Sequence, residues 1–170
     1  MHIYPPKRLV DWLVARAKRD PLPSIYHPKD GLYMERFNLK HWRYLWLRLH
    51  ITWRSDADKH RHDHPWWSIS WILDNGYFEQ YEDHTELRWR GDIVFRRATT
   101  SHRLDLTYDE TLRDGTLLPC VSLFITGPKV QSWSFIVDGA KVPWRQYIAE
   151  RDSKESFTET LSPIDRRTSP

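Results

Sequence analysis

The feature that most restricts the fold of this chain is a series of short segments in which apolar and polar side chains alternate. In the clearest of them, which covers residues 44–53, every second residue is apolar: Leu45, Leu47, Leu49, Ile51 and Trp53. Successive side chains of a β-strand point to opposite faces, so this pattern predicts a strand with one apolar face. Further strands are predicted over residues 66–73, 77–81, 85–90, 93–97, 102–107, 117–126 and 131–137. Many short strands at close spacing predict an all-β sandwich or barrel.

A helix is predicted before the strands, between Pro5 and Asp20. Apolar residues recur there at helical spacing, Pro5-Pro6 suits the start of a helix, and Pro21 and Pro23 end it. The length of 170 residues favours one domain with a sizeable core. We therefore expect three parts, which are a helical extension over residues 1–30, a β-barrel domain over 31–150 and a polar, mobile tail over 151–170.

A tight turn is predicted between two of the strands, at Asp74-Asn75-Gly76. Asn-Gly suits a type I′ turn, in which both central residues have positive φ. The sequence therefore predicts a β-hairpin in which residues 77–81 return along residues 66–73.

Three histidines from two separate segments are the candidate metal ligands. His62 and His64 lie two residues apart in a stretch that resembles a strand, so we expect their imidazoles on one face. A third imidazole, from His102 on a neighbouring strand, would complete a metal site. Imidazole suits zinc, copper, iron and nickel. The alternative is a solvated loop, because the charged and polar residues 59–61 come directly before the pair.

These two segments resemble the two motifs of the cupin superfamily. Its first motif is His-x-His followed by a glutamate and a glycine, and here His62-x-His64 leads to Gly76 at the expected distance. Its second motif runs from a glycine to a histidine eleven positions later, as from Gly91 to His102. The resemblance implies a jelly-roll β-barrel in which His62, His64 and His102 bind one divalent metal.

Several positions depart from these motifs. Ser68 stands where the first motif has its glutamate, and Leu106 replaces the closing asparagine of the second. Arg97 and Thr99 replace a proline and a glycine. Since Ser68 is a poor ligand, we expect a site of three histidines without a carboxylate. More narrowly, segments such as Asp63-His64-Pro65-Trp66 resemble one group of small bacterial and phage cupins.

Four further residues are candidates for binding a substrate. Trp66 and Ser68 are in phase with the two histidines and are expected to line the same cavity. Arg96 and Arg97 are neighbours near the end of a strand, so one of them should point inward, where it would suit a carboxylate or phosphate. The alternative for that arginine is an internal ion pair with one of three acidic residues, Asp92, Asp105 or Glu79.

Two other features of the strands have alternative explanations. His50 lies on the polar side of residues 44–53, and a core histidine bonded to the backbone is favoured over one that lines the cavity. Trp67, Ile69 and Trp71 form a second apolar face on their strand. Something must cover this face, and the candidates are the N-terminal helix and a second copy of the chain in a homodimer.

The resemblance implies a metal-dependent enzyme, and the positive charge of a metal with three neutral ligands and an inward arginine predicts a small anionic substrate. With iron, the favoured metal, a three-histidine site resembles those of cupin dioxygenases. With zinc, manganese or nickel, the same ligands would support isomerase or lyase chemistry on a sugar or an oxo-acid. A non-catalytic protein that binds a small ligand is the remaining alternative.

The composition restricts the setting of the protein. Cys120 is the only cysteine, which excludes an intramolecular disulfide and is compatible with a reducing cytoplasm. The first ten residues do not resemble a signal peptide, and no apolar run approaches the ~20 residues of a membrane span. The net charge of +3 is mild and both signs are interspersed. We therefore expect a cytoplasmic protein whose partner is a small molecule rather than a membrane or a nucleic acid.

Overall fold

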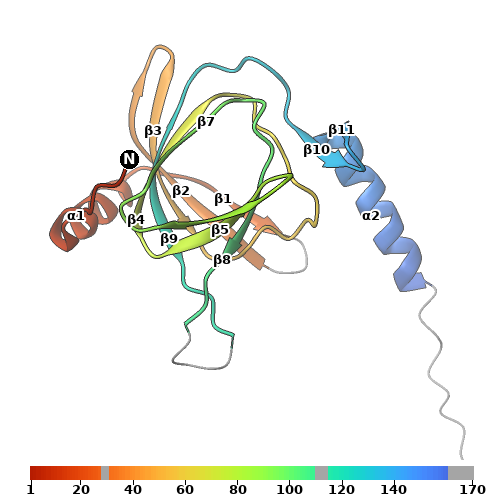
Figure 1. Ribbon diagram of the computed structural model, residues 1–170, viewed down its shortest axis with the longest axis horizontal. Helices are drawn as coiled ribbons and strands as arrows, with labels where there is room; N and C mark the ends of the chain where they lie inside the picture. The colour runs from red at the N-terminus through yellow and green to blue at the C-terminus, as the bar shows by residue number, and fades with distance from the viewer. Residues whose placement is uncertain (28–30, 110–114, 161–170) are drawn as a thin grey trace, which may run out of the picture.

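The structure, a computed structural model, describes residues 1–27, 31–109 and 115–160. Strands make up most of it, with one helix near each end of the described chain (Figure 1). In chain order the elements are α1 (Lys7–Ala17), β1 (Pro21–His27), β2 (Gly31–Trp42), β3 (Leu45–Thr52), β4 (Ser68–Asp74), β5 (Gly76–Gln80), β6 (Thr85–Trp89), β7 (Ile93–Arg96), β8 (Arg103–Leu106), β9 (Cys120–Thr126), β10 (Ser134–Val137), β11 (Ala140–Pro143) and α2 (Trp144–Thr160).

Two antiparallel sheets form the body of the molecule (Figure 1). The larger sheet has the strand order β1-β2-β3-β9-β4-β7, and the smaller has the order β6-β5-β8. Strands β10 and β11 form a separate hairpin that contacts helix α2. This arrangement confirms the predicted all-β fold of the jelly-roll type with an N-terminal helix.

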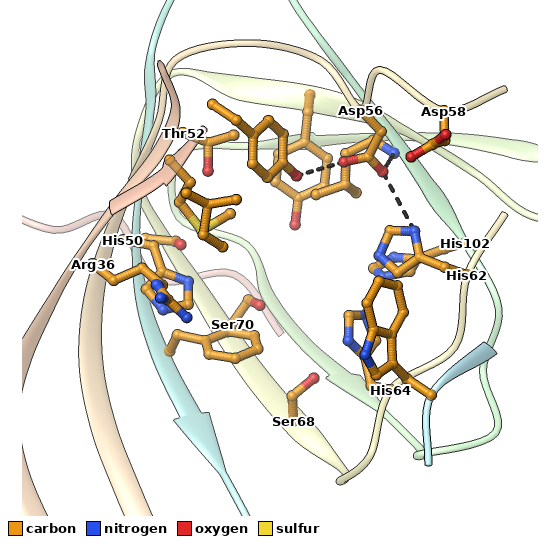
Figure 2. Close-up of a pocket in the computed structure, with 18 of the residues that line it drawn as sticks. Arg36, His50, Thr52, Asp56, Asp58, His62, His64, Ser68, Ser70 and His102 are labelled. Carbon is orange, nitrogen blue, oxygen red and sulfur yellow. Dashed lines mark hydrogen bonds and ion pairs between the residues drawn. The ribbon is translucent and has the colours of Figure 1, made fainter. Parts of the chain in front are cut away.

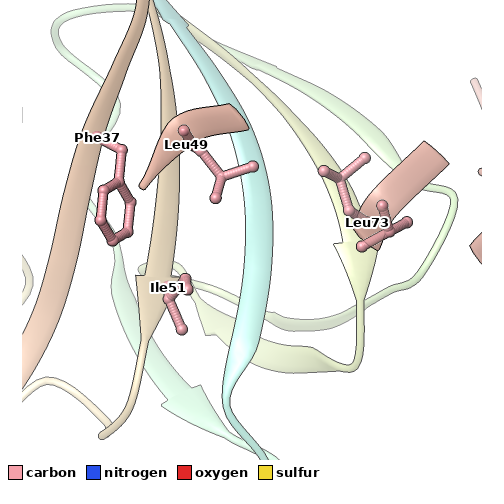
Figure 3. Packing of buried hydrophobic residues seen from close by; sticks show 6 residues of the cluster. Phe37, Leu49, Ile51 and Leu73 are labelled. Carbon is pink, nitrogen blue, oxygen red and sulfur yellow. The ribbon is translucent and has the colours of Figure 1, made fainter. Parts of the chain in front are cut away.

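The outer face of the larger sheet packs against helix α1. Phe37, Leu49 and Ile51 are buried there together with three residues from elsewhere in the chain, Val10, Ala17 and Leu73 (Figure 3). Burying an aliphatic or aromatic side chain of this size contributes roughly 1.5–3 kcal/mol, so this cluster holds the helix on the sheet. The apolar stripe predicted over residues 44–53 therefore faces α1.

Helix α1 also reaches part of the second apolar face that the sequence indicates on β4. Trp71 packs against the α1 cluster, and its indole N–H donates a hydrogen bond of 2.9 Å to the carbonyl oxygen of Ile3. The N-terminal segment is thus one cover of this face. A second copy of the chain remains a prediction.

The inner face of the larger sheet carries buried polar side chains as well as apolar ones. Because side chains alternate along a strand, the residues between those of the apolar stripe point the other way. His50, Ser70 and Ser122 are buried on this inner face and line a pocket between the sheets. The polar side of the sheet is therefore the side that forms the candidate site.

The predicted hairpin at Asp74-Asn75-Gly76 is wrong. Strand β4 belongs to the larger sheet and β5 to the smaller, so the turn carries the chain from one sheet to the other. Asn75 has a φ of 52°, and its side-chain amide donates to the carbonyl oxygen of Pro119 at 2.9 Å. Gly76 is required by a close approach, because a Cβ there would overlap the carbonyl oxygen of Arg88 on β6.

Several elements, among them β1, β11 and α2, lie where the sequence pattern predicts none. Strand β1 falls within the expected helical extension and pairs with β2 at the edge of the larger sheet. An edge strand tolerates proline, because only one of its sides forms hydrogen bonds with a neighbouring strand. Helix α2 continues to Thr160, so residues 151–160 of the expected tail are helical, and the rest of that tail lies outside the described residues. Within the described chain, neither helix has the length and apolar character needed to cross a bilayer.

Candidate metal centre

The segments that carry the three histidines are joined by backbone hydrogen bonds. His62 and His102 exchange two such bonds, with N···O distances of 2.9 and 3.0 Å, and His62 also forms a bridge with Phe135. The amide of His64 donates to the carbonyl oxygen of Ala98 at 3.1 Å. His62 and His64 therefore lie in an extended segment outside the regular strands, and its pairing with the residue before β8 brings the two motifs together.

The three imidazoles converge on one point. One nitrogen atom from each of His62, His64 and His102 lies within 4.8 Å of the other two. The Nε2 atoms of His64 and His102 face each other at 2.7 Å. Among the described residues, this group contains no cysteine and no carboxylate. The structure thus forms the predicted group of three histidines, which is able to hold a metal ion.

Carboxylates lie behind two of the histidines, and Figure 2 shows that of Asp56 beside His62. Nδ1 of His102 is hydrogen-bonded to the buried carboxylate of Glu79, which leaves Nε2 free to bind a metal. Nδ1 of His62 lies 3.8 Å from Oδ2 of Asp56. Asp56 in turn accepts a hydrogen bond of 2.5 Å from the hydroxyl of Tyr33 and one of 2.8 Å from the amide of Leu104.

Glu79 also neutralises the inward arginine. Nε and Nη2 of Arg96 donate to the two carboxylate oxygens of Glu79 at 2.5 and 2.8 Å. The remaining donors of Arg96 reach Ser70 and the hydroxyl of Tyr77, both at 2.9 Å. Burial raises the pKa of Glu79, but hydrogen bonds from His102 and Arg96 outweigh it and hold that pKa well below its usual range.

The environment of His64 and His102 favours the neutral form of both rings. Burial lowers the pKa of His64, and the neighbouring imidazoles of His102 and His62 lower it further. Burial also lowers the pKa of His102, although its hydrogen bond to Glu79 acts in the opposite direction. Neutral imidazole is the form that binds metals, so both effects prepare the group for a cation.

The three histidines lie at one side of a pocket of about 490 Å³. Trp66 and Ser68, which the sequence predicts to line the cavity, do line it, and the indole N–H of Trp66 has no partner among the described residues. Arg96 also lines the pocket and forms the ion pair with Glu79 that the sequence leaves as its alternative. Arg97 is exposed and is not among the residues that line the pocket.

Asp63, between the two histidine ligands, has a structural role. It is fully buried and accepts hydrogen bonds from the amide of Ser134 at 2.7 Å and from the ammonium group of Lys141 at 2.7 Å. These bonds tie the histidine segment to β10 and β11. Asp63 is therefore an anchor rather than a ligand, as its place between His62 and His64 indicates.

The comparisons with known proteins place this geometry among known folds. No protein-family model matches the chain, and no curated protein matches it either. Solved structures do match: DMSP lyase DddQ from Ruegeria pomeroyi DSS-3 has a TM-score of 0.55 at 16% identity, covering 85% of this chain and 72% of that one. The polyketide cyclase RemF from Streptomyces resistomycificus has a TM-score of 0.51 at 12% identity, covering 76% and 94%. An RmlC-like cupin protein from Ralstonia eutropha JMP134 has a TM-score of 0.46 at 16% identity, covering 86% and 88%.

The chain has the fold of DddQ and RemF, a cupin-type β-barrel. Within this cupin barrel, Ser68 occupies the glutamate position of the first motif and faces the pocket without extending the histidine group. The buried carboxylate comes instead from Glu79 on β5, behind His102. The narrower resemblance to one group of bacterial and phage cupins stays a prediction.

Sequence reasoning missed several residues of this site. Glu79 is foreseen only as a partner for an arginine, whereas its contact with His102 depends on the pairing of β5 with β8. Asp56 and Tyr33 come from segments with no metal-site motif. His50 is predicted to be bonded to the backbone, but it lines the pocket, and its Nε2 has no partner among the described residues. Its place on the polar side of β3 is the pattern that identifies it.

Proposed function

We propose that this protein is a metal-dependent enzyme that acts on a small anionic molecule held in the barrel pocket. The observation that carries the proposal is the convergence of His62, His64 and His102 at the side of a pocket of about 490 Å³. That volume lies in the range of small-molecule sites. Three protein ligands leave coordination positions open, which is typical of catalytic rather than structural metal sites.

The donor set suits a divalent metal. Neutral imidazoles bind iron, zinc and nickel, and Glu79 holds His102 with its Nε2 available. A bound metal supplies Lewis-acid chemistry there, and iron supplies the redox chemistry of dioxygenases as well. The residues of the chain hold the metal, orient its ligands and, through Trp66, Trp133 and Phe135, provide an apolar surface for the substrate.

The favoured reaction is that of a dioxygenase with iron as the cofactor. Its support is the three-histidine set without a carboxylate ligand, which resembles the sites of cupin dioxygenases. The second candidate is an isomerase or lyase that uses zinc, manganese or nickel. The ion pair between Arg96 and Glu79 supports this second candidate. It neutralises one arginine of the pocket, and a less positive pocket suits less charged substrates such as sugars.

The test compares metals and reactions directly. Metal-free protein is loaded with iron(II), zinc, manganese or nickel and incubated with a panel of small organic acids and sugars, with and without dioxygen. Dioxygen uptake that requires iron(II) and is absent in His102→Ala supports the dioxygenase. Product formation without dioxygen supports the isomerase or lyase. Ligand binding without turnover under every condition would refute the enzyme and leave the binding protein.

A further inference from the structure

A second group of polar side chains lines the pocket on strands β2 and β3. Arg36 pairs with His50 in the register of these strands, and Arg48 lies two residues before His50 on the same face. All three line the pocket that the histidine ligands line. Figure 2 shows Arg36 and His50 next to each other on one side of the pocket, with His62, His64 and His102 on the other.

The two arginines of this group have no carboxylate partner in the described parts of the chain. Both N–H donors that Arg36 uses go to the carbonyl oxygen of Pro23, at 2.7 and 3.2 Å. Nε of Arg48 is shielded from water and has no hydrogen-bond partner within the same described residues. Burial and the neighbouring charge of Arg36 lower the pKa of Arg48. Their situation differs from that of Arg96, whose charge Glu79 neutralises.

His50 adds a buried polar atom to the same place. Its side chain is 9% exposed, it packs beside the ring of Phe124, and its Nε2 is unpartnered within the described chain. Burial and the charges of Arg48 and Arg36 lower the pKa of His50 to about 3, so the ring is neutral near pH 7. In the tautomer that carries its proton on Nε2, this ring can donate to a ligand oxygen, which would supply the partner that Nε2 lacks.

The acidic residues that line the pocket have other partners and do not pair with these two arginines. Asp56 accepts a hydrogen bond from Tyr33, and Asp58 is paired with Arg151 at 3.2 Å. Arg36 and Arg48 therefore keep two positive charges without a counter-charge beside them, against the single carboxylate of Asp56, which lies near His62. Planar guanidinium groups match the oxygen atoms of carboxylates and phosphates with paired hydrogen bonds.

We propose that Arg36, Arg48 and His50 bind the oxyanion group, a carboxylate or a phosphate, of the molecule that the enzyme acts on. The molecule then spans the pocket, with its anionic end on β2 and β3 and its reacting end at His62, His64 and His102. This inference rests on the proposed function for the identity of that molecule as a substrate. It assigns the anion to these residues and not to Arg96 or Arg97.

The test uses the metal-free protein, so that it does not depend on the metal centre. Inorganic phosphate and succinate are titrated against wild type, with uncharged succinamide as the matched probe, and binding is followed by calorimetry and by the melting temperature. We expect phosphate, succinate or both to bind and stabilise the protein, and the one that binds identifies the class of oxyanion. Succinamide, which carries no charge, is expected to give no binding heat and no rise in the melting temperature.

Variants then locate the site. Arg48→Gln and Arg36→Gln each remove one charged hydrogen-bonding group and should weaken anion binding about tenfold or more. Arg8→Gln, on the exposed surface of α1, is the matched control and should bind as wild type does. Because a variant can fail to fold, the side-chain ¹⁵N resonances of His50 in wild type provide a second readout, and they should shift when the anion is added.

Two outcomes would overturn the proposal. One is the absence of binding by both anions to folded, metal-free wild type. The other is binding that Arg36→Gln and Arg48→Gln leave unchanged while the His50 resonances stay in place. Either outcome leaves the three-histidine metal site and its metal-dependent activity intact, so a failure of the anion site is distinguishable from a failure of the proposed function.

Discussion

Replacing Glu79 by glutamine tests both roles of this buried carboxylate, which are to neutralise Arg96 and to orient His102. Glu79 is fully buried and accepts hydrogen bonds from Arg96, Arg88 and His102. Glutamine keeps the size of the side chain but removes its charge. The change therefore leaves Arg96, which is 3% exposed, as a buried cation without its counter-charge.

The expected magnitudes follow from these contacts. Removing one partner of a buried ion pair destabilises a protein by about 3–5 kcal/mol. That is a large part of the ~5–15 kcal/mol by which a domain of this kind is stable. Loss of a carboxylate that orients a metal-binding histidine typically reduces metal affinity by about 10–100-fold. Glu79→Gln should therefore lower both the free energy of unfolding and the affinity for a divalent metal.

The matched control is Glu86→Gln. Glu86 lies directly opposite Glu79 on β6 and pairs with Arg88, but it is 41% exposed, so its loss should cost no more than about 1 kcal/mol. Urea unfolding measures stability, and competition with a chelator measures metal affinity. Adding Arg96→Met to Glu79→Gln should restore part of the stability, because it removes the unpaired charge. Equal stability and metal affinity in wild type and Glu79→Gln would refute this reasoning.

Two further predictions follow from the buried groups and the close strand approach. His50 has a pKa of about 3 in the folded chain, below the value of about 6.5 in an unfolded chain, so the unfolded state gains a proton first as the pH falls. Wild type should therefore lose about 2 kcal/mol more unfolding free energy between pH 7 and pH 5 than His50→Gln, and identical losses in urea unfolding would exclude a buried neutral ring. Gly76→Ala should lower stability by about 1–3 kcal/mol, because the added Cβ overlaps the backbone of β6. An unchanged unfolding midpoint in that variant would contradict the close approach.

The fold could be predicted because the alternation of apolar and polar residues that indicates a strand recurs in many segments of the chain. The alternation over residues 44–53 matches β3, and the spacing from Gly91 to His102 matches the segment that pairs with His62. The metal group was foreseen from strand phase, although His62 and His64 lie outside regular strands. The three imidazoles still converge without a regular strand, because the backbone hydrogen bonds between His62 and His102 hold the two segments together.

The errors come from contacts that local sequence does not determine. Asn75-Gly76 has the chemistry of a hairpin turn, but which sheet receives the next strand depends on the packing of the two sheets. Glu79 is far from His102 in the chain, and only the pairing of β5 with β8 brings them together. One local indication was available: Glu79 is in phase with Tyr77 on β5, so a charge on the buried side of a strand required a partner.

His62, His64 and His102 are proposed to hold one divalent metal. The most direct measurement is the metal content of untagged protein, by elemental analysis after loading with iron(II) and removal of free metal. His84→Ala, which removes an exposed histidine outside the group, serves as the control. We expect about one metal per chain in wild type and in the control, and near-background content in each of the three histidine-to-alanine variants. Full metal content in folded His102→Ala would contradict it.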